Sequence, residues 1–511
     1  MLVDNGVNGD SRVQKTARSA AAAGWDVVLL GRSPSGLPES WSLGDAQVRL
    51  LPVPANLAKH RHQYRRRWLR APLAYPPGGL AAHRTQWVRA WRADLAVRSA
   101  QRGSSPRLRA EETAAGLLER WVAFRVAQQG RSPRTLHGPW DRACTAFWQR
   151  LLGDRAWRRL APGLWDWELA FGPTVDALKP DLIHANDFRM LGVAARAKTR
   201  AAARGRPVKV VWDAHEFLPG VRPVRHNARW LPAHVAHERE YAPYADAVMT
   251  VSESLADLLR TTHGLAEQPD VVLNAPAADH GEPVGAESTP DLRARCGVRP
   301  ETPLLVYSGA AAEQRGLATM VEALPQLDGV HVAFVVNKPD SPYLQGLRAR
   351  AAELGVVDRV HVLPYVAHWQ VVPFLASADV GVIPIHHWPN HEIALITKFF
   401  EYSHARLPLV VSDVRTMAET VRSTGQGEVF RAEDVADYVR AVRAVLADRQ
   451  RHRAAYDRPG LLESWTWEAQ AKVLDDVYTR LLPGAARPSG GAGPTEPAGP
   501  TVGAGPFAQV G

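Results

Sequence analysis

The sequence predicts an α/β protein with two Rossmann-like domains in series, each a parallel sheet covered by helices on both faces. Short apolar segments alternate with segments of helical composition along most of the chain. A linker rich in Gly, Pro and acidic residues, 277–290, divides this alternation into two series. A chain of 511 residues with 46% apolar residues can bury two cores. A basic, Trp-rich insertion at about 55–164 interrupts the first series.

The first series predicts a doubly wound domain at residues 1–276, with the insertion inside it. Its expected strands are the end of a strand at 1–5, then 25–30, 48–53, 182–184, 208–212, one ending at 251, and 271–276. Helices are expected at 11–24, from 184 to about 203, and after Val251 with Ser252 or Ser254 as the N-cap. The strand at 1–5 is short, which leaves open whether Met1 is the true start of the protein.

The second series predicts a second domain at residues 277–463. Its expected strands are 304–309, 330–336, 359–365, 379–385 and 407–413, with helical segments between them and a helix at about 435–448. An amphipathic helix follows within 464–482, beginning near Trp467. Residues 483–511 have low complexity and are predicted to be disordered.

The positive charge of the chain is concentrated in the insertion. Residues 59–159 contain 22 Lys and Arg against 6 Asp and Glu, whereas the rest of the chain contains 40 against 46. Two interpretations stay open. The segment forms solvated helices or partly disordered arms in which Arg stems cover Trp faces, or it forms an amphipathic surface that binds anionic lipid headgroups. No recognition-helix or RNA-binding signature is present, so nucleic acid is not an expected partner. The seven Trp residues are Trp68, Trp87, Trp91, Trp121, Trp140, Trp148 and Trp157.

Cysteine usage and hydropathy favour a cytoplasmic protein. Cys144 and Cys296 are far apart in the sequence and lack the spacing of a disulfide framework or a zinc site. The first residues lack the apolar core of a signal peptide, and no run approaches the ~20 apolar residues that span a bilayer. We therefore expect a soluble protein, with peripheral attachment to the inner face of the membrane as the open alternative.

The segment 378–413 combines the features of an anion-binding site. An apolar strand leads through a loop rich in His and Asn to a helix, and a second apolar strand follows. The loop after the first strand of such a βαβ unit lies where open α/β sheets bind ligands. Helix amides there attract phosphate, Lys398 adds positive charge, and Glu401 can accept a hydrogen bond from a sugar hydroxyl. The segment therefore predicts a nucleotide-sugar site.

Four stretches resemble the motifs of a known family. They are WDAHEF (212–217), YSGAAAEQRG (307–316), HVLPYVAHWQVVPFLASADV (361–380) and NHEIALITKFFEY (390–402). Together with the two-domain organisation they resemble the family 4 glycosyltransferases, retaining enzymes of the GT-B fold that use nucleotide-diphosphate sugars. The resemblance covers about 1–54 and 165–482 and leaves the insertion and the tail outside. It implies two domains facing a cleft, the first for the acceptor and the second for the donor, and a last helix that crosses back to the first domain.

The resemblance implies how the second domain would hold the donor. Gly309 would allow close approach of the diphosphate, and Arg315 would supply charge. The family commonly has a second cation in this loop, which this sequence lacks, and Lys398 could supply it. The loop at Tyr365 and Val366 would line the nucleobase through backbone groups.

The family's E-x7-E motif matches this sequence only in part. Glu401 fits the second acid, which binds the ribose. The first acid, which meets the donor sugar, would fall at Ile393, and the nearest acid is Glu392. The resemblance therefore implies either one extra residue in the loop or a role divided among Asn390, His391 and Glu392.

His215 in WDAHEF matches a family His that lies near the sugar and the phosphate. It could donate a hydrogen bond to the donor or to the departing phosphate, and an imidazole ordinarily titrates in a useful range. On the acceptor side, the first loop departs from the family's Gly-Gly and presents Asn5, Asp10 and Arg12. Because the insertion replaces the usual region, the acceptor is left open as a glycan, a lipid-linked molecule or a small molecule.

The implied reaction is transfer of a hexosyl group from a nucleotide-diphosphate sugar to a hydroxyl, with retention at the anomeric carbon. The sequence shows no carboxylate pair of the glycosidase type and no Asp-x-Asp metal anchor. We therefore expect neither a metal nor a cofactor, with Arg315, Lys398 and helix amides holding the charge of the leaving diphosphate. Two alternatives stay open: a nucleotide-sugar 2-epimerase on the same architecture, and a non-catalytic GT-B-like binding protein.

Overall fold

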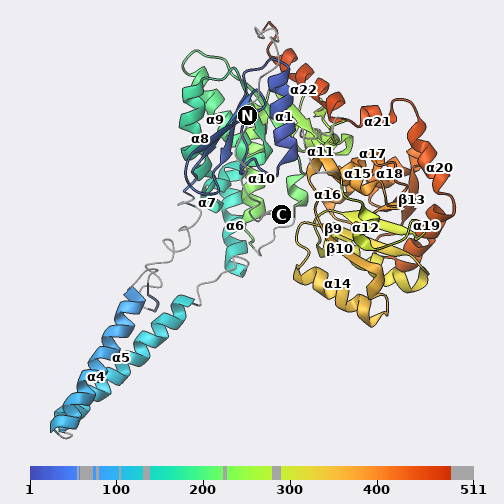
Figure 1. Cartoon of the computed structure of the whole chain (residues 1–511). Coiled ribbons are helices and arrows are strands. Elements are labelled where there is room, and N and C mark those ends of the chain that lie inside the picture. The colour runs from blue at the N-terminus through green and yellow to red at the C-terminus, as the bar shows by residue number, and fades with distance from the viewer. Residues whose placement is uncertain are drawn as a thin grey trace. The chain divides into compact units, whose positions relative to one another are not determined.

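The computed structural model of the chain describes residues 1–54, 57, 73–75, 80–102, 105–130, 138–221, 227–278 and 289–484 (Figure 1). The tail predicted to be disordered lies outside the described residues from 485 onward, as do parts of the linker and of the basic insertion. The chain forms two compact units. Unit 1 comprises Met1–Pro52, Thr174–Arg222 and Glu238–Val510, and unit 2 comprises Val53–Pro173 and Pro223–His237.

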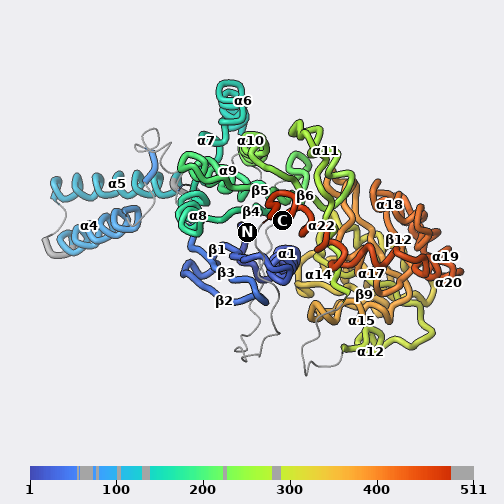
Figure 2. The backbone as a smooth tube through the Cα atoms, turned by 90° about the horizontal axis from the view of Figure 1, so that it is seen from above, coloured from blue at the N-terminus to red at the C-terminus, as the bar shows by residue number. Residues whose placement is uncertain are grey.

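The first sheet of unit 1 is parallel except at one edge. This sheet has two parts. One part contains four strands in the order β4-β5-β6-β7, and the other contains three strands in the order β1-β3-β2, in which β2 is antiparallel to β3 (Figure 2). Leu2 joins the two parts through isolated bridges to Leu30 and Ala185, so the strand end predicted at residues 1–5 is this single position. The bounds are β1 Val28–Arg32, β2 Glu39–Leu43, β3 Ala46–Leu51, β4 Leu182–Asn186, β5 Lys209–Ala214, β6 Ala247–Thr250 and β7 Asp270–Val271.

Helices from several parts of the chain pack on the first sheet. They are α1 Ser11–Ala22, α9 Asp187–Ala202, α11 Glu253–His263 and α22 Trp467–Leu481. Ser252 caps α11 by accepting a hydrogen bond from the Leu255 N–H at 3.2 Å, so Ser252 rather than Ser254 is the cap. α22 packs on α1 and adds Trp467 and Tyr478 to the hydrophobic core of the first sheet. The last described helix therefore returns to the sheet that the N-terminal residues form.

The second sheet of unit 1 contains six parallel strands in the order β10-β9-β8-β11-β12-β13. The chain runs outward from β8 to one edge and then returns to place β11 on the other side of β8. The carboxyl ends of β8 and β11 are therefore the switch point at which open sheets bind ligands. The bounds are β8 Leu304–Ser308, β9 His331–Val336, β10 Val360–Pro364, β11 Val380–Ile383, β12 Leu409–Ser412 and β13 Gly427–Phe430.

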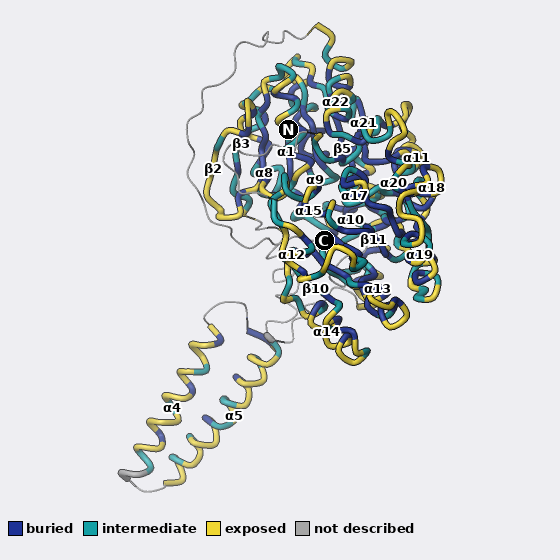
Figure 3. Tube along the Cα trace, turned by 45° about the vertical axis from the view of Figure 1, so that its right-hand side comes forward, coloured by how far each residue is buried: buried dark blue, intermediate teal, exposed yellow. Residues whose placement is uncertain are grey.

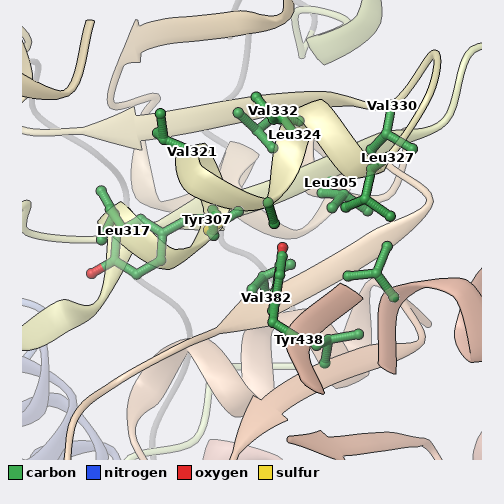
Figure 4. Close-up of a cluster of buried hydrophobic side chains, with 14 of the residues drawn as sticks. Leu305, Tyr307, Leu317, Val321, Leu324, Leu327, Val330, Val332, Val382 and Tyr438 are labelled. Atoms are coloured by element: carbon green, nitrogen blue, oxygen red, sulfur yellow. The ribbon is translucent and has the colours of Figure 1, made fainter. Parts of the chain in front are cut away.

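Helices cover both faces of the second sheet, as the sequence predicts. One face packs α13 Leu317–Ala323, α14 Pro342–Glu353 and α19 Val435–Ala447 against strand residues such as Leu305, Val332 and Val382 (Figure 4). The other packs α12 Leu292–Cys296, α15 Val371–Leu375, α17 Thr397–His404 and α18 Arg415–Thr424. Burial on both faces explains why these strands are continuous apolar runs in the sequence. Three short helices complete this part: α16 Pro389–Glu392, α20 Arg449–Ala454 and α21 Leu461–Ser464.

Unit 2 is mainly helical in its described residues. α4 Leu80–Arg102 and α5 Pro106–Gly130 lie side by side as a hairpin (Figures 1 and 3). α6 Pro139–Leu152 and α7 Trp157–Leu160 follow, while α8 Leu164–Leu178 and α10 Trp230–Tyr241 belong partly to unit 1. A small cluster that includes Val88 and Val122 holds the hairpin together. Over the described ranges, no helix has both the length and the apolar character needed to cross a bilayer.

Two buried tyrosines, one on each face of the second sheet, test this packing. Tyr402 Oη accepts a hydrogen bond from the Ser308 N–H at 2.7 Å, whereas the buried Tyr438 hydroxyl has no hydrogen-bond partner among the described residues. We expect Tyr402→Phe to lower the free energy of unfolding by about 1–3 kcal/mol, because it leaves the Ser308 N–H unsatisfied. Tyr438→Phe should leave the free energy of unfolding unchanged or raise it slightly, because it removes a buried hydroxyl that has no partner among the described residues. Urea denaturation measures both, and equal losses would contradict this account.

Candidate functional site

The loops that follow β8 and β11 lie against one another at the switch point. The His386 N–H donates to the Gln314 carbonyl at 3.0 Å. Gly316 has a φ of 73°, and a Cβ there would overlap the carbonyl oxygen of Pro384. Only glycine combines this conformation with so close an approach, so the two loops form one continuous surface.

Lys398 of α17 reaches the loop after β8. Its Nζ lies 3.7 Å from the centroid of the Tyr307 ring, and a Cβ on Gly309, whose φ is 144°, would lie 2.5 Å from the same Nζ. Burial lowers the pKa of Lys398 well below its ordinary value, Arg315 lowers it further, and Glu401 opposes the shift. The structure thus gathers the predicted residues Gly309, Arg315 and Lys398 at the switch point, where an anionic ligand would relieve the repulsion between the two cations.

Glu401 follows Lys398 by about one helical turn on α17. Burial raises the pKa of the Glu401 carboxyl, and Lys398 and Lys15 lower it in part. Tyr365 is nearly half exposed; burial raises its pKa to about 12, with Glu401 adding to the shift and Arg315 opposing it. Val366 follows Tyr365 and packs against the hydrophobic cluster between the second sheet and the helices α12, α15, α17 and α18. The predicted ribose and nucleobase residues therefore border the same charged site.

Lys15 of α1 borders this site, although it was not among the predicted residues. Its Nζ donates to the Ala275 carbonyl at 2.6 Å and to Asn274 Oδ1 at 3.2 Å. Burial lowers the pKa of Lys15 to about 7, Arg12 adds to this shift, and Glu401 opposes it. The only signal in the sequence is a Lys one turn after Arg12, and this cannot show that α1 brings its charge to α17.

A buried carboxylate at the end of β5 organises the first sheet. Asp213 is fully buried and accepts hydrogen bonds from Arg12 Nε at 3.0 Å and from Arg12 Nη2 at 2.8 Å. His184 Nε2 and His215 Nε2 lie 3.5 and 3.2 Å from Asp213 Oδ2. Burial raises the pKa of Asp213, but the charges of Arg12 and His215 outweigh it and hold the pKa well below its ordinary value.

His215 lies between two carboxylates. Its Nδ1 is 3.4 Å from Asp187 Oδ2, and its Nε2 faces Asp213. Burial lowers the pKa of His215, but Asp187 and Asp213 outweigh it and raise the pKa well above its ordinary value. The expectation that His215 titrates in the neutral range is therefore wrong, because two anions stabilise the imidazolium. About a fifth of the side chain is exposed, so this charge is accessible.

Glu216 follows His215 in the loop after β5. Burial raises the pKa of its carboxyl, Asp187 adds to the shift, and His215 and Arg315 oppose it. The next residue of this loop makes the direct contact: the Phe217 N–H donates to Asn390 Oδ1 at 3.1 Å, so the loop after β5 meets the loop after β11. Glu216 stands next to His215 in WDAHEF but was not among the predicted residues.

The three predicted acceptor-side residues, Asn5, Asp10 and Arg12, form hydrogen bonds with other groups of the protein. Arg12 is buried by its contact with Asp213 and also donates to the Val272 carbonyl at 2.7 Å. Asn5 Nδ2 donates to Asp10 Oδ2 at 2.7 Å, and Asp10 Oδ1 accepts the Val13 N–H at the start of α1. The assignment of Arg12 to an acceptor is therefore wrong, because its guanidinium neutralises a buried carboxylate. Asn5 and Asp10 shape the first loop.

Glu392, the nearest candidate for the family's first acid, is held by α18. Its Oε2 accepts the Arg415 N–H at 2.8 Å at the start of that helix, and its Oε1 lies 2.6 Å from His387 Nδ1. His387 Nε2 also faces Asp413 Oδ1 at 2.9 Å. Both oxygens of the carboxylate thus contact protein groups, and these contacts fix the loop after β11.

Asn390 and His391 connect the same loop to its surroundings. Asn390 Oδ1 accepts the Phe217 N–H at 3.1 Å, which ties the loop after β11 to the loop after β5. His391 is buried, and its Nδ1 lies 2.7 Å from the His386 carbonyl oxygen. Burial lowers the pKa of His391 to about 4, although its backbone hydrogen bond opposes the shift. A neutral His391 can hydrogen-bond a sugar but adds no charge.

The ion pairs of His215 make the stability of the fold depend on pH. Because the folded-state pKa lies above the unfolded value of about 6.5, this stabilisation is fully present below about pH 6.5 and is lost as pH rises through the folded pKa. We expect His215→Gln to destabilise the protein more at about pH 6 than at about pH 10. Urea denaturation at both values measures this, with the exposed His83→Gln on α4 as the control. A loss that does not change with pH would contradict the ion pairs.

Two family models match the chain. The model described as Glycosyltransferase Family 4 matches residues 77–275, and the model described as Glycosyl transferases group 1 matches residues 288–458. The first match begins inside the basic segment. The expectation that this segment lies wholly outside the family resemblance is therefore wrong from residue 77 onward.

Curated relatives and solved structures agree with these matches. Glycogen synthase of Mycobacterium tuberculosis is 26% identical over 61% of this chain and 71% of its own. The GDP-mannose-dependent alpha-(1-6)-phosphatidylinositol monomannoside mannosyltransferase of the same organism is 27% identical over 60% and 79%. Sucrose-phosphate synthase from Thermosynechococcus elongatus has a TM-score of 0.55 at 17% identity, covering 92% of each chain. The α,α-trehalose 6-phosphate synthase from Burkholderia multivorans has a TM-score of 0.54 at 13% identity, covering 94% and 98%.

The family models match residues 77–275 and 288–458, and the solved structures share the fold over 92% or more of this chain. The chain belongs to the family 4 glycosyltransferases and has the GT-B fold of two Rossmann-like domains.

Proposed function

We propose that this glycosyltransferase transfers a hexosyl group from a nucleotide-diphosphate sugar to a hydroxyl acceptor, with retention of the anomeric configuration. The observation that carries the proposal is the basic switch point, where the Lys398 side chain lies against Gly309 and is close enough to Arg315 for that charge to lower its pKa. The names of two similar proteins support a nucleotide-sugar donor. One is the GDP-mannose-dependent mannosyltransferase, and the other is an E. coli trehalose-6-phosphate protein bound with UDP-2-fluoro glucose.

The charges of the site suit a diphosphate. Burial and Arg315 both weaken protonation of Lys398, and a diphosphate between the two cations would reverse this, because opposite charge favours the ammonium form. Glu401 would accept hydrogen bonds from the ribose, in the position of the family's second acid. The loop at Tyr365 and Val366 would line the base through its backbone groups.

During transfer, negative charge develops on the leaving diphosphate. Arg315 and Lys398 would stabilise it, and the imidazolium of His215 would donate a hydrogen bond to the departing phosphate. With these three cations available, we propose that the reaction needs neither a metal nor a cofactor. Retention is proposed from the family resemblance. Because α18 and His387 hold both Glu392 oxygens, we propose that Glu392 positions the loop while Asn390 and His391 meet the sugar.

The cysteines support a reducing compartment. Cys144 and Cys296 are both free, and burial raises the pKa of Cys296 to about 11, so its thiol stays protonated and unreactive. We propose a cytoplasmic location on this ground.

Ligand-induced stabilisation of the full chain tests the donor site. A panel of nucleoside diphosphates and their sugars should include one donor that raises the melting temperature. At one hundred times its Kd, this donor should raise the free energy of unfolding by about 2.7 kcal/mol. We expect Lys398→Ala to abolish most of this shift, because it removes one of the two cations. Lys472→Ala, an exposed Lys on α22, should keep the shift. An unchanged shift in Lys398→Ala would remove this residue from the site, and release of an isomerised free nucleotide sugar without an acceptor would identify an epimerase.

A further inference from the structure

Exposed apolar side chains are concentrated in unit 2. Of the sixteen large hydrophobic side chains that are exposed in the described residues, thirteen lie between Val53 and Pro173. All of the exposed Trp and Phe side chains in the described ranges are among them: Trp87, Trp121, Phe124, Trp140 and Phe147. Single exposed apolar residues are normal on a protein surface, but a concentration of them in one region marks an interaction site.

Two of these helices carry their exposed apolar residues on one face. On α5, Leu117, Trp121 and Phe124 have the spacing i, i+4, i+7, and we call them the α5 stripe. The Trp121 and Phe124 rings stack with centroids 5.6 Å apart. The buried residues Ala115 and Val122 fall on another side of the helix. Figure 3 shows the hairpin of α4 and α5 exposed along its length. The α5 stripe therefore stays open to solvent although the hairpin is packed.

The second stripe lies on α6. Trp140, Phe147 and Leu151 have the spacing i, i+7, i+11, are all more than half exposed, and form the α6 stripe. The buried residues of this helix, Asp141 and Thr145, lie on another side, where Asp141 pairs with Arg229 at 2.6 Å. α6 is thus anchored through polar residues and leaves its apolar face open.

The charge around the stripes is strongly positive. α4 and α5 together contain nine arginines against four acidic residues. Arg120 precedes Trp121 on α5, and Arg150 precedes Leu151 on α6; both side chains are exposed. Interfacial Trp rings beside arginine are suited to the boundary between lipid headgroups and hydrocarbon, where the ring is buried and the charge meets phosphate.

We propose that unit 2 docks on an anionic lipid bilayer, with the α5 and α6 stripes inserted at the headgroup level. A second copy of the chain is a poor occupant, because residues 59–159 carry an excess of 16 positive charges in each copy. Nucleic acid would satisfy the arginines but would leave aliphatic residues such as Leu117 and Leu151 in water. A bilayer accommodates both, since each basic residue near an anionic surface and each buried apolar group contributes favourably.

Vesicle sedimentation of the full-length chain tests this proposal and does not depend on donor binding. The protein should sediment with phosphatidylcholine vesicles that contain about one third phosphatidylglycerol, far less with phosphatidylcholine alone, and less as salt is raised. W121S/F124S and W140S/F147S should each weaken partitioning about tenfold or more, because each pair removes two rings from the interface. Leu37→Ser, at an exposed Leu of unit 1, should bind as the parent does. Thermal unfolding checks that all variants fold.

Several results would overturn the proposal. They are equal sedimentation with neutral and anionic vesicles, unchanged binding by both stripe variants, and a parent dimer that the stripe variants dissociate. Duplex DNA binding that the stripe variants abolish, without vesicle binding, would also overturn it. If the protein shows any of these results but keeps its donor-induced thermal shift, membrane docking is contradicted and the proposed reaction is not.

Discussion

The carboxylate of Asp213 is the charge on which the first half of unit 1 depends. It is fully buried at the end of β5, where an unpaired ion would cost several kcal/mol, about 3–5 by comparison with broken buried pairs. Arg12 of α1 neutralises it and also binds the Val272 carbonyl beyond β7. His184 of β4 faces the same carboxylate, and its Nδ1 lies 2.8 Å from Tyr478 Oη on α22. One ion therefore fixes the first helix, two strands and the last helix.

The same carboxylate continues into the site through His215. Asp187 approaches the other side of that imidazole from a left-handed backbone conformation, with a φ of 59°, which few residues other than glycine adopt. Such strain is commonly held at functional positions. The Phe217 N–H, two residues after His215, donates to Asn390 Oδ1 of the loop after β11, so loops from the two sheets meet close to this imidazole.

Much of the fold could be predicted, because strands buried on both faces leave continuous apolar runs. The expected strands at 304–309 and 330–336 agree with β8 and β9 to within one residue. β2 and β13 were not predicted. β2 is a mostly exposed antiparallel edge strand, and β13 is an edge strand with little apolar sequence. Both lack the pattern on which the prediction depends.

Residues of the candidate donor site could be proposed where they stand in local motifs. Gly309, Arg315, Lys398 and Glu401 stand in motifs with a fixed relation to a strand or a helix, and the structure gathers them at one switch point. Arg12 was misassigned because its partner Asp213 is 201 residues away in the sequence. Long-range ion pairs of this kind leave no local pattern.

A double-mutant cycle on Arg12 and Asp213 tests the central claim most directly. If the buried ion pair organises the first sheet, Arg12→Met and Asp213→Asn should each lower the free energy of unfolding by about 3–5 kcal/mol, because each leaves a buried partner unpaired. The double variant should then lose much less than the sum of the two, with a coupling of at least about 1 kcal/mol. Additive losses in urea denaturation, or single losses below about 0.5 kcal/mol as at an ordinary surface site, would contradict the role assigned to Asp213.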